Sequence, residues 1–363
     1  MDGYISTYII YNLVFMPFLF YFLTDKTYPK IVRFYIFYVS SFAILIAVSG
    51  LRYKVGADYE NYVWIFHNLD EYQSGYSVEW GYYFINKIIK YLQLDEQFVF
   101  FVVGFLTLFF IYSYKESNLN VKILVILTYV LVFYFSSFTQ IRQLLAMCVA
   151  VYGVSEYFSD FKKFKCLSWL LISSLFHSST LLLIPAIFLL GYIKYKAYYS
   201  LLVFLIFVFF FSFDLRDFFV KFDILSFSKF NSYLYSEHYN GLHTTISNIV
   251  RYFIKSFVVF YMFFLDKKYF KDIKWYNTTM ILNSLLVVSI AISFNFYIFH
   301  RVVLLFMLSN IFSVNLLLKS SYKYKYLILF FYFLLNFIMY EYFVFFETYY
   351  DAAPYQSILD RNY

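Results

Sequence analysis

Long apolar runs recur along the whole chain, and short polar connectors rich in lysine separate them. A transmembrane helix needs about 20 mostly apolar residues, so the pattern predicts an all-α, polytopic integral membrane protein with about 12 transmembrane helices. We expect one transmembrane domain over residues 1–363. The predicted spans are 4–23, 31–49, 97–114, one ending near 138, one ending near 158, two shortened spans within 166–193, 197–213, 249–265, one ending near 293, 300–318 and 326–346.

Composition supports this reading and excludes several classes of function. The chain is 63% hydrophobic and 14% charged, which a soluble domain of this size does not sustain. The net charge of +7 is spread over the connectors and forms no stripe, so nothing indicates nucleic-acid binding. Positively charged connectors instead mark the cytoplasmic side of a membrane protein.

Cofactor motifs are missing from the sequence. Cys148 and Cys166 both lie in apolar runs, which favours buried packing and supports neither a disulfide framework nor a thiolate metal site. There is no phosphate-binding lysine loop, no dinucleotide-binding glycine pattern and no zinc-binding helix motif. We therefore expect no metal and no cofactor, and any energy for chemistry must come with the substrate.

Residues 50–96 form the first predicted outer loop, which carries the densest group of charges beside the apolar runs. It begins Gly-Leu-Arg-Tyr-Lys-Val-Gly-Ala-Asp-Tyr-Glu-Asn-Tyr, with Arg52, Asp58 and Glu60 close together. Charged residues near a bilayer are costly and often mark function. The alternative is a solvated loop whose charges pair with one another, but such exposed pairs add little stability.

An amphipathic helix is predicted from Ser77 to Leu92, within the same outer loop. Its apolar positions recur at helical spacing, while Asn86 and two lysines occupy the other face, which suits a helix lying along the membrane interface. The predicted apolar positions are Tyr82, Ile85, Ile88, Ile89 and Leu92. A second long outer loop is predicted over residues 214–248, and a mobile loop or lid is the expected form for so long a polar insertion.

Arginine and lysine are distributed differently in the predicted topology. Lysines mostly fall in cytoplasmic connectors, whereas six of the seven arginines, all except Arg33, fall at the outer face or in outer helix ends. Arginine binds phosphate in a planar, bidentate way that lysine does not reproduce. The outer arginines therefore indicate a phosphate-containing ligand.

Two further positions have a functional and an ordinary interpretation. Arg142, which opens the predicted fifth span, either binds an anion or is an anchor whose charged end reaches the interface. His177 lies between two long apolar runs and is either a hydrogen-bonded core histidine or a catalytic or diphosphate-binding group. Arg301 likewise either binds an anion or is an anchor whose charged end reaches the interface.

Taken together, these segments resemble the EpsG-like polymerases of the Wzy type, which assemble O-antigen, capsule and exopolysaccharide. The resemblance lies in the stretch 50–62 and the contexts of Arg142 and His177. Further matching segments are Glu79-Trp80-Gly81-Tyr82, Leu175-Phe176-His177-Ser178-Ser179, Arg301 and Pro354-Tyr355-Gln356-Ser357-Ile358.

This resemblance implies a metal-independent glycan polymerase in the bacterial inner membrane, with a site that faces the periplasm. Its substrates would be undecaprenyl-diphosphate-linked oligosaccharides, and a Wzz-type chain-length regulator is the candidate membrane partner. The growing glycan would pass from undecaprenyl diphosphate to the non-reducing end of a new repeat unit. The expected catalytic residues are His177, Arg142, Glu79 and Asp58, and the expected diphosphate-binding residues are Arg52, Arg142, Arg301 and Arg251.

Within this scheme the acceptor hydroxyl needs a base, for which His177 ranks first, followed by Glu79 and Asp58. Three other functions stay open. A polyprenyl-dependent glycosyltransferase of the C-fold class would add single sugars and often need a divalent metal. An O-antigen ligase would use lipid A core as acceptor. A flippase for lipid-linked oligosaccharide would instead need cations near the bilayer midplane and internal repeats.

Overall fold

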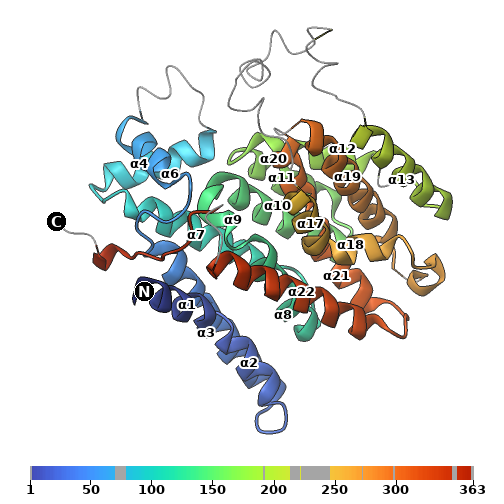
Figure 1. The fold of residues 1–363 in the computed structure, drawn as a ribbon, viewed down its shortest axis with the longest axis horizontal. Helices are drawn as coiled ribbons and strands as arrows, with labels where there is room; N and C mark the ends of the chain where they lie inside the picture. Colours follow the sequence, from blue (N-terminus) through green and yellow to red (C-terminus); the bar gives the residue numbers. More distant parts are fainter. Residues whose placement is uncertain are drawn as a thin grey trace. The chain divides into compact units, whose positions relative to one another are not determined.

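The computed structural model describes residues 2–69, 79–190, 193–212, 221, 246–271, 273–296, 299–345 and 350–360. The described chain is helical and contains no strand beyond one isolated bridge (Figure 1). It divides into two compact units, of which the first comprises Met1–Leu181 with Phe337–Tyr363 and the second comprises Leu182–Asn336. Each unit is described by itself below.

The helices have the following bounds. They are α1 (Asp2–Leu13), α2 (Met16–Leu23), α3 (Lys30–Gly50), α4 (Tyr59–His67), α6 (Trp80–Tyr91), α7 (Gln97–Tyr112), α8 (Leu119–Phe133), α9 (Ser136–Thr139), α10 (Ile141–Asp160), α11 (Lys163–Ser174), η1 (Ser178–Leu182), α12 (Leu183–Phe188), α13 (Ala197–Ser212), α17 (Ile246–Lys255), α18 (Phe257–Met262), η3 (Lys267–Phe270), α19 (Tyr276–Asn295), α20 (His300–Phe306), α21 (Ser309–Lys319), α22 (Lys325–Phe345) and η5 (Ile358–Asp360).

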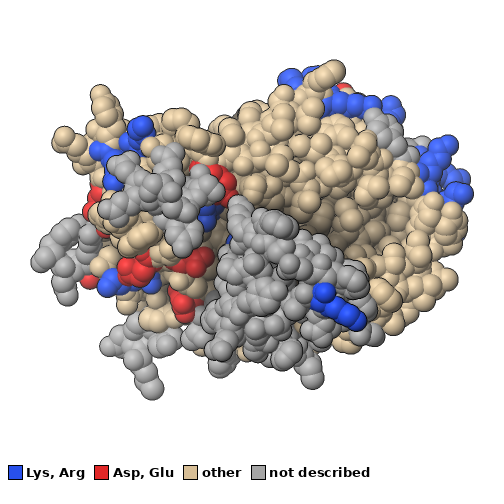
Figure 2. Space-filling model, turned by 90° about the horizontal axis from the view of Figure 1, so that it is seen from above, with Lys and Arg blue, Asp and Glu red and all other residues tan. Residues whose placement is uncertain are grey.

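Four of the described segments are long and apolar enough to cross a membrane: Lys30–Gly50, Tyr276–Phe294, His300–Lys319 and Lys325–Phe345. The pair α1 and α2 makes a fifth if it counts as one bent span. Four more apolar helices have 10–17 residues. In Figure 2, charged side chains gather in patches and broad areas of the visible surface are uncharged. The chain is a helical membrane protein, and the count of about 12 spans stays a prediction.

Helix breaks account for part of the difference between the predicted and observed spans. The predicted span 4–23 is two helices that meet at a bend of 45°. Pro17 lies in the first turn of α2 and has no N–H to donate to the carbonyl of Leu13, so the α1 ladder cannot continue. The predicted break at His177 is confirmed, because α11 ends at Ser174 and the next helical turn begins at Ser178.

Helix α10 forms the core of the first unit and packs against α7 and α11. Most of its side chains are buried, and small residues bring its neighbours close. A Cβ at Gly153 would lie 2.5 Å from Cβ of Trp169 on α11. A Cβ at Gly104 on α7 would lie 2.9 Å from Oγ of Ser49 on α3. The backbones therefore approach closely, which fixes where the ends of these helices lie.

One end of the first unit carries an ion-pair network. Nζ of Lys115, after α7, lies 3.2 Å from Glu156 and 2.7 Å from Asp160, both on the last turns of α10. Lys162 adds a contact of 2.8 Å to Asp160. Lys115 and Lys162 lie in connectors predicted as cytoplasmic, and Glu156 lies at the end of the predicted fifth span. Since α7 and α10 both end here, their first turns lie together at the opposite end of the unit.

Helix α6 confirms the helix predicted after residue 77, but the predicted faces are partly wrong. Asn86 is fully buried, whereas Ile88 and Leu92 are exposed. Tyr82, Asn86 and Ile89 form the face that packs into a cluster with α4, α7 and α10. Burial of the Asn86 amide is tolerated because its Nδ2 donates to the carbonyl of Tyr82 at 2.8 Å. The amide oxygen of the same side chain has no partner among the described residues.

In the second unit, α19 packs against α13, α20 and α21. A buried hydrogen bond of 2.9 Å joins Ser313 on α21 to Asn283 on α19. Two helical segments of this unit are interrupted: Ser256 separates α17 from α18, and two residues separate α20 from α21. The predicted outer loop 214–248 lies almost entirely outside the described residues.

Candidate active site

The loop that follows α3 is held by a segment from the far end of the sequence. Residues 350–358 run beside residues 51–57 and form one antiparallel bridge between Arg52 and Ser357. The backbone N–H groups that donate across this junction are Tyr53 to Gln356 (2.8 Å), Ile358 to Leu51 (2.8 Å), Gly56 to Asp351 (2.9 Å) and Ala57 to Tyr350 (3.1 Å). These two segments, which both resemble the polymerase family, therefore lie side by side and form one wall of the candidate site.

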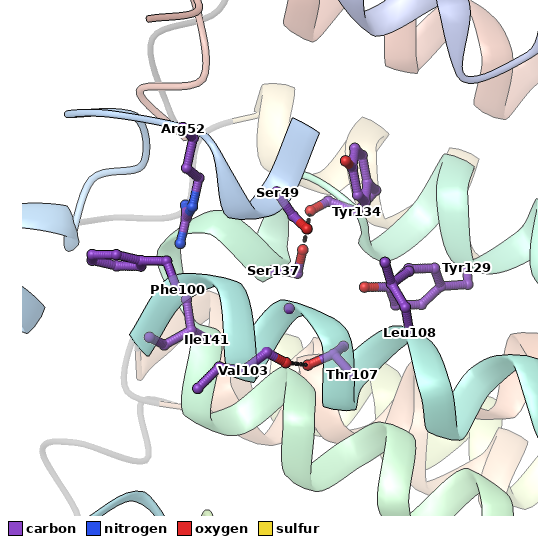
Figure 3. Close-up of a pocket in the computed structure, with 11 residues that line it drawn as sticks. Ser49, Arg52, Phe100, Val103, Thr107, Leu108, Tyr129, Tyr134, Ser137 and Ile141 are labelled. Atoms are coloured by element: carbon purple, nitrogen blue, oxygen red, sulfur yellow. Dashed lines mark hydrogen bonds between the residues drawn. The ribbon is translucent and has the colours of Figure 1, made fainter. Parts of the chain in front are cut away.

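Arg52 is buried under this wall and is only 2% exposed. Its Nη1 donates to the carbonyls of Val55 and Phe138 at 2.9 and 2.6 Å. Its guanidinium also lies 5.0 Å from the ring centroid of Phe100 and 4.8 Å from that of Phe138. Figure 3 shows Arg52 reaching from the loop toward Phe100, at a small cavity of about 10 Å³. Burial lowers the pKa of Arg52 to about 10, so the side chain is charged at neutral pH.

These contacts indicate that Arg52 is a positioning residue, which ties the loop to α9, the short helix before α10, through Phe138. A substrate diphosphate would reach this guanidinium only after those contacts break, and the predicted binding role stays a prediction. Gln97 holds the same loop from α7, because its Nε2 donates to the carbonyls of Gly50 (2.6 Å) and Arg52 (2.9 Å). Gly56 has a φ of 107°, and a Cβ there would lie 2.8 Å from Nη1 of Arg52.

Arg142 has a different environment, in the first turn of α10. Its Nη1 lies 2.5 Å from Oε2 of Glu79, the residue just before α6. The two side chains are 23% and 19% exposed, so the pair is partly screened and still open to a ligand. Two residues that the sequence places 63 positions apart therefore form one charged pair.

Two tyrosines complete the surroundings of Arg142. The Tyr62 hydroxyl on α4 is in hydrogen-bond contact with the guanidinium, which also lies 5.7 Å from the ring centroid of Tyr82. Burial raises the pKa of Tyr62, the positive charge of Arg142 acts in the opposite direction, and Asp58 is near enough to add to the rise. The Tyr82 hydroxyl is buried beside the Asn86 side chain on the same helix. Asp58 itself precedes α4.

His177 lies in the turn after α11, which packs against the start of α6. The Gly81 N–H donates to the carbonyl of Leu175 at 2.7 Å, and a Cβ at Gly81 would lie 2.8 Å from the ring of Phe176. The backbone thus places His177 beside the helix that follows Glu79. Its Nδ1 lies 2.7 Å from Oγ of Ser179 and accepts a hydrogen bond from the Ser179 backbone N–H at 3.3 Å. A substrate would therefore meet Nε2, the other nitrogen of the ring.

Arg251 and Arg301 belong to the second unit. Arg301 is exposed in the first turn of α20, and Nη1 of Arg251 on α17 lies 3.4 Å from Oδ1 of Asn248. The structure thus brings together Arg52, Asp58, Glu79, Arg142 and His177 at one end of the first unit. That these residues bind a diphosphate together with Arg251 and Arg301 stays a prediction.

Tyr62, Tyr82 and Gln97 were not predicted as site residues. Tyr62 and Tyr82 lie in stretches that resemble the family, but with tyrosine so frequent in this sequence, composition does not single them out. Gln97 opens an apolar run and gives no signal of its own. Among the described residues, no group of three or more histidines, cysteines or carboxylates is arranged to hold a metal ion.

Comparison with known proteins supports the resemblance. The family model described as the EpsG family matches residues 35–357, which is most of the chain. No curated protein and no solved structure matches the chain. The matched region contains α10, the Arg142–Glu79 pair, His177 and the tail that covers Arg52. The chain belongs to the EpsG family, a family of membrane proteins of the polysaccharide-polymerase type.

Proposed function

We propose that this protein is a metal-independent glycosyltransferase that polymerises a bacterial surface polysaccharide, an O-antigen or capsule, at the periplasmic face of the inner membrane. The growing glycan passes from undecaprenyl diphosphate to the non-reducing end of a new undecaprenyl-diphosphate-linked repeat unit. Family membership supports the polymerase class. The finer statement depends on the chemistry of the residues at one end of the first unit.

The Arg142–Glu79 pair is the observation that carries the proposal. A diphosphate leaving group develops negative charge as its bond to the sugar breaks, and a fixed cation in a partly dry site stabilises that charge. Arg142 meets this need because Glu79 and Tyr62 hold its guanidinium in place before substrate arrives. A preorganised donor costs no reorganisation when charge develops.

The reaction balances with groups on this chain. The acceptor hydroxyl oxygen forms a bond to the anomeric carbon of the donor glycan, and the bond from that carbon to the diphosphate oxygen breaks. The electron pair stays on undecaprenyl diphosphate, next to Arg142. The hydroxyl proton passes to Nε2 of His177. This requires Nδ1 to carry the ring proton and donate it to Oγ of Ser179 (2.7 Å), in place of accepting from the Ser179 backbone N–H (3.3 Å). Glu79 ranks second as base and Asp58 third.

Deletion of the gene, followed by gel analysis of the surface polysaccharide, tests the function. A polymerase leaves caps of a single repeat unit, and long chains return with the wild-type gene but not with Arg142→Gln. Complete loss of surface glycan would contradict the proposal and indicate a flippase or ligase. Activity of the purified enzyme that disappears with a chelator and returns with a divalent metal would favour the C-fold class.

A further inference from the structure

Helix α17 in the second unit gathers cationic groups on one side. Arg251, Tyr252 and Lys255 follow the spacing i, i+1 and i+4, which places their side chains on one face of a helix. The opposite positions are apolar, with Val250 and Phe253 exposed. Lys255 is only 8% exposed, although lysine is rarely buried in proteins. Its charge is therefore held inside the unit, on the face that carries Arg251.

Helix α20 brings a histidine and one further cation, Arg301, to this face. The Tyr252 hydroxyl contacts Nδ1 of His300, and the two rings lie 5.8 Å apart between centroids. His300 is close enough to Lys255 and to Arg301 for both charges to act on its ring. The sequence separates α17 and α20 by more than forty residues. In space, Lys255 and Arg301 lie near His300, and Arg251 lies one turn before Lys255 on the same face of α17. We call these four residues the second-unit cationic cluster.

The helix is interrupted directly after this cluster. Lys255 ends α17, and Phe257 begins α18. Between them the Ser256 hydroxyl is fully buried and has no hydrogen-bond partner among the described residues. Asn336 stabilises the interruption, since its Nδ2 donates to the carbonyl of Ile254 at 3.2 Å. In membrane proteins, interrupted helices with buried polar groups are common where a polar or charged ligand binds.

We propose that the second unit contains its own diphosphate site, in which Lys255, Arg251 and Arg301 bind the phosphate oxygens. His300 and Tyr252 position the two helices, and Ser256 offers a hydroxyl to the same ligand. This inference rests on the proposed function, because polymerisation joins two substrates that each carry a diphosphate. The Arg142 site takes one diphosphate and the second-unit cationic cluster takes the other. Arginine binds phosphate oxygens through two parallel hydrogen bonds, and lysine binds them as a compact point charge.

The test is a binding stoichiometry with farnesyl diphosphate, a short polyprenyl diphosphate, on the full chain in nanodiscs of zwitterionic phospholipid. Wild-type protein should bind two equivalents. Lys255→Gln should weaken one of them by about tenfold or more, and Arg142→Gln should weaken the other. Lys255→Arg should retain both. The matched control is Lys271→Gln, which removes the charge of an exposed lysine of the same unit and should leave both equivalents unchanged.

Two results would overturn the second site. One is that Lys255→Gln still binds two equivalents like wild type. The other is that anionic phospholipid added to the nanodisc removes the Lys255-dependent equivalent as effectively as inorganic pyrophosphate does, because the cluster would then bind lipid head groups. Failure of the proposed function has a separate signature. Two equivalents would still bind, Lys255 and Arg142 would each control one, and no polymer would form from lipid-linked repeat units.

Discussion

Replacing Arg142 by lysine keeps a positive charge but changes the geometry that we consider essential. The guanidinium contacts Glu79 at 2.5 Å and also the Tyr62 hydroxyl, through nitrogens that lie in one plane. An ammonium group cannot keep the contacts to Glu79 and Tyr62 and also bind a phosphate through two parallel hydrogen bonds. If Arg142→Lys loses one charged hydrogen bond to the leaving diphosphate, the cost is about 1.5–3 kcal/mol. That corresponds to a rate roughly 10- to 150-fold lower.

The assay is single-turnover polymerisation of lipid-linked repeat units by purified protein, together with polymer length on a gel. Arg33→Lys is the matched control, since Arg33 is an arginine fixed by its contacts, which donates to the carbonyls of Tyr21 (2.7 Å) and Tyr28 (3.2 Å). This control should lower thermal stability and leave the rate per folded molecule unchanged. A near-normal rate and polymer length for Arg142→Lys would refute the bidentate role. So would an equal loss of rate in Arg33→Lys.

Three further outcomes are expected. Gly56→Ala should lower the free energy of unfolding by at least about 1 kcal/mol, because its φ is 107° and a Cβ would meet a carbonyl oxygen at 2.5 Å; an unchanged thermal melt would contradict this. His177→Ala should slow polymerisation by about 100-fold or more, while Ser179→Ala should mainly shift the pH profile; normal polymer from His177→Ala would pass the base role to a carboxylate. Hydrogen bonds from two lysines, Lys115 first, lower the pKa of Asp160 below its ordinary 3.8. The resulting stabilisation is present above about pH 4 and is lost as the pH falls through the lowered folded-state pKa, so Asp160→Asn should flatten acid unfolding followed by tryptophan fluorescence.

Membrane class, helical fold and the break at His177 follow from the sequence because they depend on local apolar runs and on a polar interruption within one of them. The lengths of the membrane spans are predicted less well from the sequence. Pro17 bends the first span, and polar residues such as Ser256 interrupt others, so that fewer helices than expected are individually long enough to cross a bilayer. Such interruptions depend on which carbonyls find another donor, which is decided by neighbouring helices.

The candidate site shows the same limit. Arg142 and Glu79 each stood out in the sequence, but their pairing depends on how α6 packs on α10. Arg52 was expected to bind a diphosphate together with Arg142, Arg301 and Arg251. Its guanidinium instead packs against Phe100 and Phe138, and its backbone pairs with a segment roughly 300 positions later, which no local pattern in residues 50–62 reveals. Asn86 was assigned to the polar face because its side chain is polar. Only the packed helix shows that its amide N–H donates to the carbonyl of Tyr82.

The junction between residues 51–57 and 350–358 also has a consequence for biosynthesis. The two segments leave the ribosome roughly 300 residues apart, which at about 5–20 residues per second is roughly 15–60 s. Throughout that interval the loop lacks the backbone partners that later hold it. A nascent or prematurely terminated chain can therefore insert most of its helices without assembling the loop around Arg52. Completion of translation therefore becomes a condition for assembling this part of the first unit.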